Sequence, residues 1–165
     1  MPVKVQPVEG KAFTVTGRVT RTPWTIIPGI VSGAAYASGD AMGAPFEVDM
    51  GSTSGLILGV LVSDLDKEQL AFDVVLFEQM IAGVADNAAF DLSDGERFAY
   101  AGHISVVAGD YAAFNDNAAA AVRITPQGYV CPTGRMVCQL VTRGVPNYTG
   151  ASDLAIRLIL IPDLV

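Results

Sequence analysis

The stretch Leu56-Ile57-Leu58-Gly59-Val60-Leu61-Val62 is apolar at every position and is closed by Ser63 and Asp64. A short apolar run bounded by polar residues is typical of a strand that is buried on both faces of a sheet. We therefore expect a central strand at Leu56–Val62, with the rest of the fold arranged around it.

Apolar or alternating segments of similar length recur along the chain, and each ends near Gly, Pro, Asn or Asp. Many are rich in β-branched and aromatic residues, which favour strands. The other segments expected to form strands are Ala12–Arg21, Thr25–Ile27, Pro45–Met50, Phe72–Phe77, Ile104–Val107, Tyr111–Phe114, Ala118–Ile124, Tyr129–Cys131, Met136–Arg143 and Leu154–Ile161. Thr125–Gly128 is expected to be a hairpin turn. About ten short strands predict an all-β fold, either a β-sandwich or a jelly-roll-like barrel.

One or two short helices are expected between these strands. Ser93 and Glu96 have the spacing of a capping box, in which each side chain bonds the backbone amide of the other residue. This spacing predicts a short helix at Asp94–Tyr100. Glu78–Val84 is expected to form a turn or a second short helix.

Residues 1–11 are expected to form an extended N-terminal arm, followed by a single β-sandwich domain at residues 12–165. Pro2 and Pro7 disfavour a helix in the arm and favour extended or edge-strand geometry. A chain of 165 residues is long enough to bury roughly 70% of its unfolded surface as one domain. Two interpretations of this segment stay open: a frayed terminus, which is the simpler one, and an arm that orders against a neighbouring subunit.

The chain is acidic and carries few charges. Only 16% of its residues are charged, against roughly 25% in a typical globular domain. Because less of the surface is protected by charge, we expect part of it to be covered by a partner. The net charge is −7, and the ten Lys and Arg residues are scattered without a basic window. This pattern argues against nucleic acid and anionic membranes as direct partners.

Two further features concern the cellular compartment. No apolar stretch reaches the roughly 18 residues that predict a membrane span. Met1–Lys4 is not followed by the apolar core of a secretory signal, so we expect a protein that is made in a cytoplasm and stays there in solution. In a reducing compartment, two free buried thiols at Cys131 and Cys138 are favoured over a disulfide.

The chain has little of the chemistry that enzymes use. His103 is its one histidine, and no Gly-x-Ser-x-Gly motif supplies a nucleophilic serine. His103, Cys131 and Cys138 have no recognised zinc spacing, so a structural histidine is favoured. We therefore expect no enzymatic activity, no catalytic residues, no metal site and no cofactor.

Asp64, Asp66 and Glu68 form the densest charge cluster and faintly resemble a calcium loop. The calcium pattern needs a glycine that is missing here, and its final glutamate comes later in the sequence than Glu68. A solvated acidic loop between strands is therefore favoured over a metal site.

Aromatic residues leave one binding alternative open. Trp24 lies beside Pro23, Ile26 and Ile27, which favours a packing anchor over a ligand platform. Ordinary core and turn positions are favoured over a carbohydrate-binding platform for the five tyrosines, Tyr36, Tyr100, Tyr111, Tyr129 and Tyr148.

The residues that we nominate as contacts with a partner are Val3, Val5, Trp24, Asp64, Asp66 and Glu68.

Several stretches carry a resemblance to known proteins. They are Tyr36–Gly43, Leu70–Phe77 with Ala85–Phe90 and Ser93-Asp94, and Gln139–Tyr148 with Ser152–Leu158. Together they resemble, in the same order, a group of small structural proteins of tailed bacteriophages and prophages. The likeness covers about residues 30–161 and includes no catalytic motif, while residues 1–29 fall outside it.

The resemblance implies a capsid decoration (cement) protein that binds the outer face of an assembled phage head and stabilises it. Such proteins commonly have β-sandwich or jelly-roll-like folds. The implied partners are the major capsid protein and further copies of the chain, as a dimer or trimer. The implied location is the capsid surface of a virion assembled from protein made in the host cytoplasm. The alternatives are a head-fibre, tail or head–tail joining component, and a carbohydrate-binding module on the virion surface.

Overall fold

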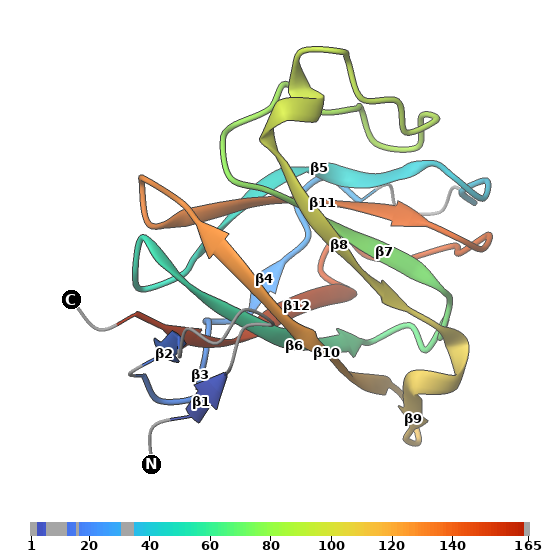
Figure 1. The fold of residues 1–165 in the computed structure, drawn as a ribbon. Helices are drawn as coiled ribbons and strands as arrows, with labels where there is room; N and C mark the ends of the chain where they lie inside the picture. Colours follow the sequence, from blue (N-terminus) through green and yellow to red (C-terminus); the bar gives the residue numbers. More distant parts are fainter. Residues whose placement is uncertain (1–2, 6–12, 16, 31–34, 164–165) are drawn as a thin grey trace.

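The computed structural model describes residues 3–5, 13–15, 17–30 and 35–163. Two antiparallel sheets lie face to face, and a separate two-stranded hairpin precedes them (Figure 1). The helices among the described residues are two short 3-10 helices, η1 (Glu96–Ala99) and η2 (Ala108–Asp110). The protein is therefore all-β, which confirms the fold class predicted from the sequence.

We call the two sheets sheet I and sheet II. The spatial order in sheet I is β3 (Thr20–Arg21), β12 (Leu154–Pro162), β6 (Ser54–Asp64), β10 (Ala118–Val130) and β9 (Tyr111–Ala113), and β4 (Thr25–Ile26) also pairs with β12. The order in sheet II is β5 (Ala41–Asp49), β11 (Arg135–Thr142), β7 (Phe72–Phe77) and β8 (Tyr100–Val106). The separate hairpin consists of β1 (Val3–Val5) and β2 (Phe13–Val15).

The main core lies between the two sheets. In the first half of β12 buried residues alternate with half-buried ones, as expected for a strand with one face toward the core, whereas Leu158–Ile161 are all buried. The residues that join this cluster include Leu154, Ile156, Leu158 and Leu160 of sheet I, and Val74, Leu76, Met136 and Leu140 of sheet II. Burial of each large apolar side chain contributes about 1.5–3 kcal/mol, so the contact between the sheets is the main source of stability.

The outer face of sheet II is also covered. Residues 78–99 cross it as a long loop, seen above the sheets in Figure 1. Ile81, Phe90 and Leu92 of this loop pack against outward-facing side chains of β7 and β11. As a result β7 is buried at every position.

The prediction that Leu56–Val62 is buried on both faces is therefore wrong. In β6 buried positions alternate with half-buried ones such as Leu58 and Leu61, so the outer face of this strand is only partly covered. Strands β7 and β11 have the two buried faces instead.

The strand expected at Ala12–Arg21 is divided in two. Strand β2 pairs with β1, whereas β3 pairs with β12 of sheet I. Gly17 lies between them, and a Cβ there would come within 2.5 Å of the carbonyl oxygen of Pro162. The close approach to the end of β12 requires glycine and separates the hairpin from the sheet.

The turn expected at Thr125–Gly128 is also wrong. Strand β10 runs through this segment, and its register against β6 shifts between Arg123 and Gln127. Proline is tolerated at such a bulge because its missing N–H is not needed there. The Gln127 Nε2 atom donates to the Ala101 carbonyl of β8, which joins the edges of the two sheets.

The predicted capping box is present, but the helix after it is reduced to η1. The Ser93 amide donates to Glu96 Oε2 at 3.2 Å, and the Glu96 amide donates to Ser93 Oγ at 3.4 Å. Glu96 Oε1 accepts a bond of 3.0 Å from the Gly83 amide, so this glutamate also fixes the covering loop. The turn or short helix expected at Glu78–Val84 is not formed: the chain bends at Glu78 and Gln79 and is irregular from there to Val84.

Candidate functional site

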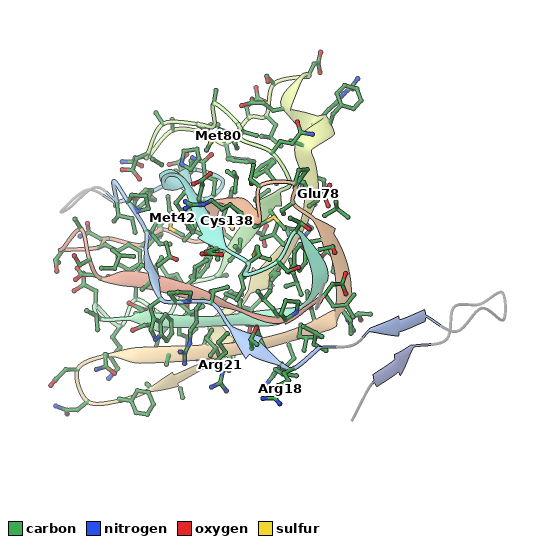
Figure 2. The ribbon with its side chains drawn as sticks, turned by 90° about the vertical axis from the view of Figure 1, so that its left-hand side faces the viewer. Arg18, Arg21, Met42, Glu78, Met80 and Cys138 are labelled. Carbon is green, nitrogen blue, oxygen red and sulfur yellow. The ribbon has the colours of Figure 1, made fainter. Side chains whose placement is uncertain are left out.

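The nominated contact residues lie at three separate places. Val3 and Val5 are in β1, in a hairpin that extends away from both sheets (Figure 2), and the structure describes this strand but not their side chains. Trp24 lies between β3 and β4, while the three acidic residues lie at the end of β6 and just after it. The structure therefore does not bring the nominated residues together in one patch.

Trp24 lies on the outer face of sheet I and is 45% exposed. The guanidinium carbon of Arg157, from β12, lies 4.5 Å from the centre of the indole ring, within the range of a cation–π contact. Both residues line a shallow depression of about 370 Å³ that is otherwise edged largely by alanines of β9 and β10. Trp24 thus packs on an arginine at the surface and is not an anchor in the core.

Asp64 is fully buried at the end of β6, so its carboxylate is not exposed to a partner. Asp64 Oδ2 accepts a hydrogen bond of 2.8 Å from the Gln69 amide, which closes the loop after the strand. Asp64 Oδ1 has no hydrogen-bond partner among the described residues. Burial raises the pKa of this carboxyl above its usual value, against the smaller opposing effect of the loop amides.

The raised pKa of Asp64 predicts a specific pH dependence of stability. The contribution of this group is fully present below the pKa of the unfolded chain, about 3.8, and is lost as the pH rises through the higher pKa of the folded state. Asp64→Asn retains the acceptor but does not ionise. We expect its free energy of unfolding, measured by urea titration, to improve relative to wild type between about pH 4 and pH 7. A difference between the two proteins that stays constant over this range would contradict the assignment.

Asp66 is bound to the segment that precedes β12. Its carboxylate accepts hydrogen bonds from the amide and the hydroxyl of Thr149, the latter at 2.9 Å. Desolvation and a hydrogen bond with Asp66 raise the pKa of the neighbouring Asp153 carboxyl. Glu68 is half-buried. Of the nominated acidic residues, Asp66 and Glu68 thus remain accessible to a partner.

The titratable groups considered for catalysis are dispersed. His103 is exposed on β8, where its Nδ1 atom lies 2.8 Å from the Tyr100 hydroxyl. Cys131 and Cys138 are free thiols with buried side chains, and burial raises the pKa of Cys131 to about 11. Across residues 3–5, 13–15, 17–30 and 35–163, no group of three or more His, Cys, Asp and Glu side chains is placed to hold a metal ion. The same residues include no helix long and apolar enough to cross a membrane.

The five tyrosines do not form a common platform. Tyr36, Tyr129 and Tyr148 are buried in the core, Tyr111 is half-buried, and Tyr100 is exposed on β8. A flat sugar-binding surface needs several aromatic faces on one side of the molecule. The carbohydrate-binding alternative therefore loses the residues on which it depended.

A cavity of about 260 Å³ lies where β6 and β10 meet the segments that follow β7 and β12. Its two carboxylates are both engaged: Glu78 accepts a bond of 2.9 Å from the Val130 amide, and Asp163 accepts one of 2.7 Å from the Ser54 hydroxyl. The sequence contains no signal for this cavity, because its lining comes from four distant segments.

Comparisons of the chain with protein families, with curated proteins and with solved structures find no match.

Proposed function

We propose that this protein is a capsid decoration protein, a non-enzymatic virion component that binds the major capsid protein on the outer face of an assembled phage head. The observation that carries this proposal is a closely packed two-sheet body from which a hairpin extends (Figure 2). A projecting hairpin suits attachment to neighbouring subunits, because exposed strand edges add to the sheets of other chains. The resemblance of residues 30–161 to phage structural proteins supports the same function.

Simple physical arguments connect this shape with stabilisation of a shell. A protein that binds only the assembled shell shifts the equilibrium toward that shell by mass action and needs no chemistry of its own. The net charge of −7 is repelled by packaged DNA, which favours the outer face over the inner face. Symmetric copies on such a lattice repeat the same contact many times.

The proposal is tested by the position and copy number of the protein in purified particles. Cryo-electron microscopy is expected to place it on the outer face of the head, and gel densitometry to give a copy number close to that of the major capsid protein or a simple fraction of it. Roughly a dozen copies or fewer at one vertex or along the tail would assign the protein to a joining or tail structure instead. Absence from the particle would contradict a virion role altogether.

A further inference from the structure

The charges of this chain are divided between two parts of the structure. The N-terminal segment, residues 1–21, contains the β1–β2 hairpin and its connection into sheet I. It has four basic residues and one acidic residue, a net charge of +3, whereas residues 22–165, which we call the body, have six basic and sixteen acidic residues, a net charge of −10. Basic residues thus outnumber acidic ones in the N-terminal segment, whereas the body has a large excess of acidic residues.

The basic side chains at the base of the hairpin are free to bind a partner. Arg18 and Arg21 are both exposed, and the guanidinium group of neither forms a hydrogen bond or ion pair with another described residue, although the backbone of Arg21 pairs with Ile159 of β12. Figure 2 shows Arg18 on the side of the body from which the hairpin extends, with Arg21 close to it in β3 of sheet I. No group of the described chain therefore competes for these two guanidinium groups.

Most basic residues of the body, in contrast, are already engaged. Arg135 and Arg143 form ion pairs of 2.8 and 2.7 Å with Glu47 and Asp73. The other three contacts are those of Lys67 with the Phe114 and Asn115 carbonyls, Arg97 with the Phe98 ring, and Arg157 with the Trp24 ring. The body therefore presents excess negative charge, with little free positive charge to balance it.

No described strand of the sandwich pairs with the hairpin. Strands β1 and β2 pair with each other over three residue pairs and, among the described residues, with no other strand. An isolated two-stranded hairpin is at best marginally stable in water. The hairpin therefore gains stability when it lies on a surface, and the free positive charge beside it favours an acidic surface.

We propose that this surface is the acidic body of a second copy, so that the N-terminal segment of one subunit holds its neighbour. A segment of +3 and a body of −10 are complementary, and every copy supplies both. Nucleic acid is a weaker candidate, since the attached body is repelled by phosphates and the segment has few charges with which to neutralise them. The inference rests on the proposed decoration function and adds to it a partner for the N-terminal segment. Its test uses the purified protein without a phage head. The self-association and the decoration function can therefore be contradicted independently of each other.

The test compares two double variants of the full chain that change the net charge by the same amount. Arg18→Glu with Arg21→Glu alters the base of the hairpin, and Arg97→Glu with Arg123→Glu alters two exposed arginines of the body. Dissociation constants are measured by sedimentation equilibrium at about 50 mM and about 500 mM salt. We expect wild-type self-association that weakens at high salt, about tenfold weaker association for the hairpin variant, and a change within about twofold for the body variant. Matching thermal melts verify that both variants are folded.

Three results would overturn the inference. One is a wild-type protein that remains monomeric at every concentration and at both salt conditions. Another is an equal effect of the two double variants, which would show that overall charge, and not the N-terminal segment, controls association. The third is a rise in the fluorescence anisotropy of a labelled DNA duplex when wild-type protein is added, with no rise when the hairpin variant is added. That result would show that the N-terminal segment binds nucleic acid. Position in the particle tests the decoration function separately.

Discussion

Gly59→Ala is expected to lower the free energy of unfolding by about 3–5 kcal/mol, a large share of the stability of a typical domain. Gly59 lies in the middle of β6, between β10 and β12, with φ at +153°. A Cβ at this position would lie 2.0 Å from the carbonyl oxygen of Val122, a backbone atom of the neighbouring strand. The methyl group therefore forces β6 and β10 apart at the centre of sheet I.

Urea denaturation measures this loss, and Gly95→Ala is the matched control. Gly95 has φ at −74°, and a Cβ there would meet no heavy atom within 4 Å. Its replacement is expected to change the free energy of unfolding by less than about 0.5 kcal/mol, or to stabilise the chain slightly through the unfolded state. Equal effects at the two glycines would show that the close packing of β6 on β10 does not control stability.

Gln139→Leu is expected to cost about 3 kcal/mol, although leucine is apolar and similar in size. Gln139 is fully buried on β11, under the covering loop formed by residues 78–99. Its Nε2 atom donates to the Gly43 carbonyl at 3.1 Å and to the Val84 carbonyl at 2.5 Å, and its Oε1 atom accepts from the Val84 amide at 3.1 Å. Leucine leaves the buried Gly43 carbonyl and the two half-buried backbone groups of Val84 without this partner. A fully buried group left in this way costs about 1–3 kcal/mol, and a half-buried one costs less.

The same substitution at Gln79, which is exposed on the covering loop, is the control for this experiment. Gln79→Leu is expected to change the urea midpoint little, because a surface substitution away from such contacts usually stays within about 0.5 kcal/mol. Hydrogen exchange gives a second measurement: the Val84 amide is expected to lose protection in Gln139→Leu and to keep it in Gln79→Leu. Protection of Val84 that survives in Gln139→Leu would show that other contacts hold the loop.

The strands were largely predictable from local pattern. The bounds predicted at Phe72–Phe77 are those of β7. Those predicted at Leu154–Ile161 differ from β12 by one residue at one end, and those predicted at Met136–Arg143 differ from β11 by one residue at each end. The larger errors are at Ala12–Arg21 and Thr125–Gly128, where the outcome depended on a strand distant in sequence. A close approach to Pro162 divided the first segment, and pairing with β6 continued the second through a bulge. Strands β5 and β8 also each begin four residues before the predicted starts at Pro45 and Ile104.

The candidate contact residues were less predictable than the strands. Asp64 has the charge of a surface residue, yet the fold buries it and uses it to bind the Gln69 amide. Trp24 has the character of a core residue, yet it lies at the surface against Arg157. Sequence pattern indicates which residues alternate along a strand, but it does not indicate which face another segment covers.

The sequence by itself determined the all-β class, most strand positions, the capping box at Ser93 and Glu96, and the division of charge between residues 1–21 and the body. These properties depend on residues close together in the chain or on simple counts of charge. Only the tertiary structure decided which strands are buried on both faces, where Gln139 finds its partners, and that the β1–β2 hairpin extends away from the two sheets (Figure 2). Those outcomes depend on the packing of segments far apart in sequence, because burial and hydrogen bonding are properties of the surroundings that the folded chain creates.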